Sequence, residues 1–147
     1  MLSSIFLVDE AYFEYVEDGE YPDGLDYVKA GRNVIVLRTF SKIHGLAGLR
    51  IGYGIGGPDL IETMNRVREP FNTSSLSQAA ALEALEDAAH VERSLKVNQE
   101  GKLTLYRAFE RLGLSYTPTE ANFIWSYRSN CSVAVDPKTE ATTEWGR

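Results

Sequence analysis

Two short, uninterrupted apolar runs, each ended abruptly by polar residues, constrain the fold of this chain more than any other feature. The first run covers residues 5–8 and stops at Asp9, and the second covers residues 34–37 and stops at Arg38. Such runs, rich in strand-forming side chains and without polar alternation, are typical of strands buried on both faces of a parallel sheet. The sequence therefore predicts an α/β fold in which both runs are strands of this kind.

Polar residues that follow the two predicted strands are candidates for a ligand site. Asp9 follows the first strand, while Thr39, Ser41 and Lys42 follow the second. In open α/β sheets, ligands bind at the carboxyl ends of the strands, where the rigid strand fixes the position of each side chain. We therefore expect Asp9 and Lys42 to face the same bound molecule.

The residue types at these positions suit an aldehyde cofactor that carries a phosphate. A lysine attacks a carbonyl only as the free amine, which partial burial or a nearby cation such as Arg50 favours. A guanidinium can bind phosphate through two parallel hydrogen bonds, and hydroxyl groups add neutral donors. A carboxylate keeps a pyridine nitrogen protonated, and Asp9 and the nearby Tyr12 would serve different edges of the ring. Taken singly, each residue has a commoner structural explanation, such as a turn cap for Asp9 or a solvated loop cation for Lys42.

Four segments resemble the fold-type-I pyridoxal-phosphate-dependent aminotransferases, and among these they are most similar to the histidinol-phosphate aminotransferases. The segments are residues 8–12, 38–42, 45–53 and 67–72. The resemblance implies that Lys42 forms the Schiff base with pyridoxal phosphate, that Asp9 partners the pyridine nitrogen, and that Tyr12 partners the phenolic oxygen. It also implies a set of phosphate-binding residues, namely Thr39, Ser41 and Arg50.

The resemblance further implies part of the fold-type-I large domain, a mostly parallel sheet flanked by helices, followed by the start of a small α/β domain. We expect residues 1–88 to form the C-terminal half of the large, cofactor-binding domain and residues 89–128 to begin the small C-terminal domain. Residues 129–147 match no part of the family and are expected to be a divergent tail without ordered structure. The match covers about residues 5–125, so part of the family's cofactor site and its substrate-binding arginine are expected to lie outside the match.

The activity implied by the resemblance is transamination between histidinol phosphate and 2-oxoglutarate in histidine biosynthesis. The expected partners are a small-molecule amino donor, an oxo-acid and a second copy of the chain in a homodimer. Two alternatives stay open. The first is a related enzyme with the same cofactor, either an aromatic aminotransferase or a threonine-phosphate decarboxylase. The second is a truncated, non-catalytic remnant that binds the cofactor weakly or only pairs with another subunit.

Composition argues against several other classes of protein. The formal charge of −6 disfavours nucleic acid or an anionic membrane as the main partner. The apolar run after Met1 is too short for a signal peptide or a membrane span. A single cysteine, Cys131, allows no internal disulfide, and the two histidines, His44 and His90, have no neighbouring metal ligands in sequence. We therefore expect a cytoplasmic protein without a metal site.

The remaining elements are predicted from helix and strand signals. Helices are expected over residues 25–30, from Pro58 to Pro70, over 76–88, and from 89 to a C-cap at Gly113; further strands are expected over 49–55, 114–117 and 122–125. The apolar stripe of the Pro58 helix is predicted to be core and comprises Leu60, Ile61, Met64 and Val67. A sheet of this kind with unpaired edges and uncovered faces is prone to association, so we expect the chain expressed alone to aggregate or self-associate.

Overall fold

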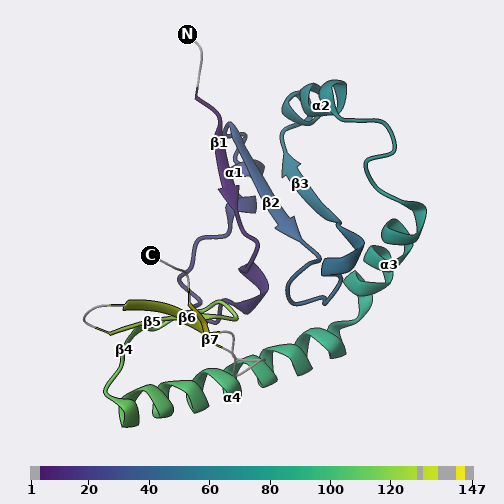
Figure 1. Cartoon of the computed structure of the whole chain (residues 1–147). Coiled ribbons are helices and arrows are strands. Elements are labelled where there is room, and N and C mark those ends of the chain that lie inside the picture. Colours follow the sequence, from purple (N-terminus) through teal and green to yellow (C-terminus); the bar gives the residue numbers. More distant parts are fainter. Residues whose placement is uncertain (1–3, 129–130, 136–141, 145–147) are drawn as a thin grey trace. The chain divides into compact units, whose positions relative to one another are not determined.

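The computed structural model describes residues 4–128, 131–135 and 142–144, and the chain divides into two compact units (Figure 1). The first unit comprises Met1–Glu14 and Asp18–Ala88, and it contains strands β1 to β3. The second unit comprises Tyr15–Glu17 and Ala89–Arg147, and it contains strands β4 to β7. Among the described residues, no helix combines the length and the apolar content needed to cross a bilayer.

The sheet of the first unit has the order β1-β2-β3 and is built around the two predicted strands. β1 (Phe6–Asp9) and β2 (Val34–Thr39) pair in parallel, with Asp9 opposite Leu37. β3 (Gly52–Gly56) then pairs with β2 in the antiparallel direction, so the sheet is mixed within these three strands. The parallel pair therefore brings the carboxyl ends of both apolar runs to one edge of the sheet.

β1 is far more exposed than its sequence predicts. Phe6 and Leu7 are 65% and 63% exposed, and Ile5 is 57% exposed, whereas the first three residues of β2 are buried. The interpretation of the first apolar run as a strand buried on both faces is therefore wrong for this chain. The physical reason is that Phe6 and Leu7 point to opposite faces of the sheet, and the described part of the chain covers neither side chain.

Helices of the first unit connect and flank these strands. They are η1 (Phe13–Tyr15), α1 (Gly24–Lys29), η2 (Ala47–Leu49), α2 (Pro58–Val67) and α3 (Ser75–Glu86). A small core joins α3 to the loop after β2 and consists of Phe40, Ile51 and Ala81. Ser74 caps α3 by accepting a hydrogen bond from the Ser77 backbone nitrogen, and the Ser77 hydroxyl donates to the Leu49 carbonyl at 2.9 Å.

The apolar stripe of α2 does not form core as predicted. None of the α2 residues is buried, and Met64 and Val67 are 40% and 82% exposed. Ile61 is half-buried and lies close to Gly56 of β3. An amphipathic pattern shows which helix face is apolar but not which element covers it, and here only the start of the stripe is covered.

The second unit combines one long helix with an antiparallel sheet. α4 (Ala88–Leu112) precedes β4 (Ser115–Thr117), β5 (Ile124–Arg128), β6 (Cys131–Val135) and β7 (Thr142–Glu144), which pair in the order β4-β5-β6-β7. Gly113 ends α4 with φ of 63°, as expected for a C-cap glycine. Strands β6 and β7 fall in residues 129–147, where the sequence analysis expects a tail, and the rest of that segment lies outside the described residues.

The core of the second unit forms where α4 packs against the first strands of the sheet. Phe109 and Ile124 are buried there, and half-buried Tyr106 and Tyr116 pack around them. Two buried polar side chains of α4 donate to the connection between β4 and β5. The Asn98 amide reaches the Ala121 carbonyl at 3.3 Å, and the Lys102 ammonium reaches the Thr119 carbonyl at 3.1 Å.

Candidate functional site

Parallel pairing of β1 with β2 places the predicted site residues around one edge of the first unit's sheet. Asp9 is the last residue of β1 and lies opposite Leu37, and Thr39 ends β2 two residues later. The ladder continues one step beyond β1, because the Glu10 backbone nitrogen donates to the Leu37 carbonyl at 2.8 Å. The strand ends that carry Asp9 and Thr39 are therefore neighbours.

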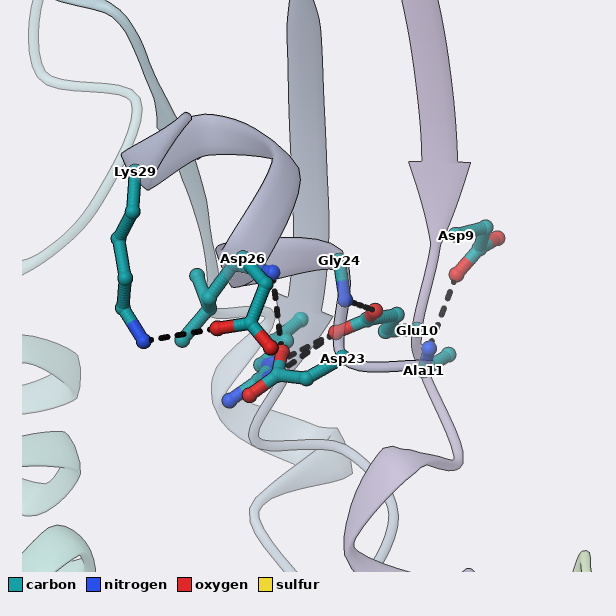
Figure 2. Close-up of polar contacts among 9 residues, drawn as sticks. Asp9, Glu10, Ala11, Asp23, Gly24, Asp26 and Lys29 are labelled. Carbon is teal, nitrogen blue, oxygen red and sulfur yellow. Dashed lines mark hydrogen bonds and ion pairs between the residues drawn. The ribbon is translucent and has the colours of Figure 1, made fainter. Parts of the chain in front are cut away.

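The Asp9 carboxylate is exposed and partly fixed by the backbone. Its Oδ1 accepts a hydrogen bond from the Ala11 backbone nitrogen at 3.0 Å (Figure 2). This contact is the turn cap that a purely structural aspartate would make, and it also orients the carboxylate. An oriented, solvent-accessible carboxylate at a strand end is able to accept a hydrogen bond from a ligand.

Lys42 and Tyr12 approach each other although they come from different segments of the chain. The Lys42 ammonium nitrogen lies 4.9 Å from the centroid of the Tyr12 ring, within the range of a cation–π interaction. Both residues are half-buried. The structure therefore brings together the amine and the phenol that the sequence analysis assigned to one ligand.

The three residues predicted to bind phosphate stand at the two ends of the loop that contains Lys42. At its start, Thr39 Oγ1 accepts a hydrogen bond from the Ser41 backbone nitrogen at 3.0 Å, and both residues are half-buried. At its end, Arg50 is exposed and its guanidinium donates to the Ala47 carbonyl at 2.9 Å. Arg50 has φ of 50° and ψ of 52°, a left-handed conformation that costs about 1–2 kcal/mol in a residue other than glycine. Strained residues of this kind often occur at ligand sites.

An ion-pair network that the sequence analysis missed lies beside these strand ends. Arg38 donates from Nε and Nη2 to one oxygen of Glu10, at 3.0 and 2.8 Å, and from Nη2 to Asp23 at 3.0 Å. The other Glu10 oxygen accepts a hydrogen bond from the Gly24 backbone nitrogen at 2.8 Å (Figure 2). The Glu10 side chain is only 1% exposed. One sequence signal could have found the pair, because Arg38 directly follows one predicted parallel strand and Glu10 is the second residue after the other.

The network places Arg38 between two carboxylates and an aromatic ring. Burial alone would lower the pKa of Arg38, but its hydrogen bond to Glu10 and the negative charges of Glu10 and Asp23 outweigh burial and raise the pKa. The guanidinium carbon lies 3.8 Å from the centroid of the Phe13 ring. Burial also raises the pKa of Tyr53, and the charge of Arg38 only partly opposes this shift. Both shifts favour the protonated forms of the two side chains.

Gly24 is needed where α1 begins next to Glu10. A Cβ atom at this position would lie 2.5 Å from Glu10 Oε1 and 2.8 Å from Cγ2 of Val36. Both distances are shorter than real Cβ contacts allow, and neither neighbouring side chain is free to move because both are buried. The missing side chain is what lets the Gly24 backbone reach the Glu10 carboxylate.

The two histidines belong to different units of the chain. The His44 ring packs 5.2 Å from the Phe40 ring in the first unit, and the His90 Nε2 atom lies 3.3 Å from the Ser94 hydroxyl in α4. Within the described ranges, histidine, cysteine, aspartate and glutamate side chains form no group of three or more that could hold a metal ion.

Comparisons with known proteins match this chain to aminotransferases. A sequence model of the family described as aminotransferase class I and II matches residues 2–134. The histidinol-phosphate aminotransferase of Moorella thermoacetica is 60% identical over 124 residues, which are 84% of this chain and 32% of that protein. The chain therefore spans about a third of the length of the curated relatives that it matches.

Solved structures share the fold of this chain. The histidinol-phosphate aminotransferase of Sinorhizobium meliloti, solved in complex with pyridoxal-5'-phosphate, matches with a TM-score of 0.77 and 31% identity, over 84% of this chain and 33% of that chain. The L-threonine-O-3-phosphate decarboxylase of Porphyromonas gingivalis matches with a TM-score of 0.70 and 26% identity, over 84% and 38%. The first similarity is the stronger by both measures.

Proposed function

Since the chain belongs to the class I and II aminotransferase family, whose members use pyridoxal phosphate, we propose that it forms part of a histidinol-phosphate aminotransferase. Such an enzyme moves an amino group between histidinol phosphate and an oxo-acid such as 2-oxoglutarate, a step of histidine biosynthesis. The choice of substrate is supported by the 60% identity to the enzyme of that name from Moorella thermoacetica. One observation carries the catalytic part of the proposal, namely the approach of the Lys42 amine to the Tyr12 ring beside the ends of the parallel strands.

The donors around this edge fit pyridoxal phosphate in their chemistry. When bound, the cofactor supplies an aldehyde for covalent attachment and a ring that takes up electrons from the substrate carbon. In our proposal, Lys42 Nζ would hold the cofactor at its aldehyde carbon, whose oxygen would leave as water, and the amine, once released, would take a proton from the substrate carbon. Asp9 accepts a hydrogen bond from the protonated pyridine nitrogen, and Tyr12 donates to the phenolic oxygen. The phosphate is bound by a cation and two hydroxyls, those of Arg50, Thr39 and Ser41.

The proposal predicts that the chain binds pyridoxal phosphate covalently at one lysine. Adding the cofactor should produce an absorbance band in the visible range, and borohydride should fix the cofactor as a stable pyridoxyl adduct. Peptide mass spectrometry is expected to locate the adduct at Lys42, because this amine is half-buried beside the other cofactor-binding groups. Adducts spread over exposed lysines such as Lys29, with none at Lys42, would contradict the proposal.

Arg50 is expected to contribute to phosphate binding although its left-handed backbone conformation is unfavourable. Arg50→Gly removes the unfavourable left-handed conformation of a non-glycine residue but adds flexibility to the unfolded chain, so the free energy of unfolding should change by less than about 1 kcal/mol. The dissociation constant of pyridoxal phosphate should rise about tenfold or more, as expected when a charge-assisted hydrogen bond worth about 1.5–3 kcal/mol is lost. Urea denaturation and absorbance titration measure the two quantities.

Arg50→Lys is the matched control, because it keeps both the charge and the strain and should weaken binding less. If the unmodified chain, Arg50→Gly and Arg50→Lys bound pyridoxal phosphate with equal affinity, the assignment of Arg50 to the phosphate site would be wrong.

We further propose that the protein acts as a homodimer in the cytoplasm. The apolar surface of the first unit supports association, since Phe6, Leu7 and Phe71 are 65%, 63% and 100% exposed. The cytoplasmic assignment is supported by the biosynthetic role and by the single cysteine of the chain.

Association should be visible with the chain alone. Sedimentation is expected to detect species larger than the 16.4 kDa monomer, because β1 stands at the end of its sheet among the described strands and carries exposed apolar side chains. Leu7→Lys should shift the population toward the monomer, whereas Tyr27→Lys, at an exposed position on α1, should not. A compact, cooperatively folded monomer in the unmodified chain would refute the expectation.

An alternative to the proposed function is a non-catalytic protein that binds the cofactor without turnover. An adduct at Lys42 without transamination of histidinol phosphate would favour this alternative. Transfer of the amino group to 2-oxoglutarate would exclude it.

A further inference from the structure

The buried pair formed by Glu10 and Arg38 connects the same two strands that carry the proposed cofactor-binding residues. Glu10 directly follows Asp9, and Arg38 directly precedes Thr39. Successive side chains of a strand point to opposite faces, so Glu10 and Arg38 lie on one face and Asp9 on the other. Figure 2 shows the Asp9 and Glu10 carboxylates on opposite sides of the chain. The pair therefore lies behind the proposed site and does not form part of it.

The hydrogen bonds of the pair fix the positions of the neighbouring chain segments relative to one another. Arg38 binds one Glu10 oxygen through two nitrogens, at 3.0 and 2.8 Å, and the second Glu10 oxygen holds the Gly24 backbone nitrogen at 2.8 Å. Arg38 also reaches Asp23, whose Oδ1 caps α1 by accepting from the Leu25 backbone nitrogen at 2.9 Å. Three segments are thus tied together by hydrogen bonds with defined geometry, namely the end of β1, the end of β2 and the start of α1.

The energetics of such a pair favour a geometric role over a stabilising one. Two charges taken out of water lose hydration energy that their attraction only roughly recovers, so replacing both with uncharged groups of similar size is often neutral. Removing one partner is costly, because a buried charge is then left unpaired. A network at this energetic balance is better explained by the positions that it fixes than by a gain in stability.

We propose that Glu10 and Arg38 are positioning residues, which hold the ends of β1 and β2 in register so that Asp9 and Lys42 meet the same ligand. This inference rests on the proposed function for the identity of the ligand. Neither side chain touches the cofactor, and both act through the backbone of the residues that do. Loss of the pair should therefore loosen the site while the rest of the first unit stays folded.

The test uses a double variant that removes both charges and keeps the packing. Glu10→Gln retains an oxygen that accepts from the Gly24 nitrogen, and Arg38→Met retains an unbranched chain against the Phe13 ring. The matched control is the double variant Asp26→Asn with Lys29→Met, which removes an ion pair of the same charges whose side chains are 72% and 71% exposed. The urea midpoints of both double variants should stay close to that of the unmodified chain.

Two readouts decide the inference, and only the second involves the cofactor. Amide hydrogen exchange in the cofactor-free chain should become faster in residues 9–12 and 39–42 of the Glu10/Arg38 variant, and stay unchanged in residues 76–86 of α3. The dissociation constant of pyridoxal phosphate should rise about tenfold or more, as expected when at least one charge-assisted hydrogen bond worth about 1.5–3 kcal/mol is no longer held in place. The control variant should match the unmodified chain in both readouts.

The possible outcomes separate this inference from the proposed function. Unchanged exchange in residues 9–12 and 39–42 of the Glu10/Arg38 variant would overturn the positioning role, whatever the cofactor does. Faster exchange throughout the first unit would also overturn it, because the pair would then be a general stabilising element. Failure of the unmodified chain to form an adduct at Lys42 would overturn the proposed function alone.

Discussion

Replacing Lys42 with alanine is expected to abolish the visible absorbance band and the borohydride-stable adduct with pyridoxal phosphate. The expected loss is complete rather than partial, because alanine has no amine to attack the aldehyde. The free energy of unfolding should change little, since Lys42 is half-buried and its one cation–π contact, with Tyr12, is worth about 0.5–1 kcal/mol. Absorbance, peptide mass spectrometry and urea denaturation together measure these effects.

Two controls make the Lys42 result specific. Lys29→Ala removes a lysine that is 71% exposed in the same unit and should leave both the band and the adduct intact. Lys42→Arg keeps a cation over the Tyr12 ring but cannot form the covalent bond, so it should behave like alanine in the adduct assay. A full-strength band in Lys42→Ala would show that the cofactor attaches elsewhere and would overturn the assignment of this lysine.

The single substitution Arg38→Met should destabilise the first unit by about 3–5 kcal/mol, the usual cost of leaving a buried charge without its partner. The Glu10 carboxylate is 1% exposed, and without Arg38 it would keep only the hydrogen bond from the Gly24 nitrogen. A loss of this size is a large fraction of the total stability of a typical domain, about 5–15 kcal/mol. The shift of the urea midpoint, at constant slope, measures it.

The matched control for Arg38 is an exposed pair in the same unit. Arg66→Met breaks the ion pair between Arg66 and Glu62, whose side chains are 73% and 66% exposed, and should cost less than about 1 kcal/mol. Adding Glu10→Gln to Arg38→Met should restore most of the lost stability, because the unpaired charge is then gone. If Arg38→Met cost no more than Arg66→Met, Glu10 would not behave as a buried charge.

Local sequence patterns predicted several elements well. The apolar runs predicted strands β1 and β2 and their parallel pairing, and Gly113 ends α4 in the second unit as expected. The predicted family and its α/β fold are confirmed by the match to class I and II aminotransferases. Caps, periodicity and run length are properties of neighbouring residues, so one sequence is enough to detect them.

Burial could not be predicted from the same patterns. β1 has the composition of a buried strand, yet Phe6 and Leu7 are exposed, and Val67 at the end of the α2 stripe is 82% exposed. An apolar side chain favours burial, but tertiary contacts determine which element covers it, and the local sequence does not contain those contacts. The roles of the proposed site residues at atomic detail depend on such contacts too, and they stay predictions for the cofactor experiments above.

The Glu10–Arg38 network was missed for a different reason. A charged residue near a strand end is usually interpreted as solvent-exposed or as a cap. The register of β1 against β2 is what brings these two side chains together. Once β1 and β2 are assumed to be parallel with Asp9 opposite Leu37, the opposite charges of the next residues, Glu10 and Arg38, predict an ion pair. The same signal does not extend to Asp23, which reaches Arg38 from the loop before α1.

The close approach at Gly24 has a consequence for protein engineering. A methyl group there would meet the Glu10 oxygen at 2.5 Å and the Val36 Cγ2 atom at 2.8 Å, so the three positions share one fixed amount of space. In a library randomised at residues 10, 24 and 36 and selected for cofactor capture, enlargement of residue 24 should be recovered only with shorter side chains at both other positions. Selection would then reveal correlated sets of substitutions, with few viable clones changed at residue 24 alone.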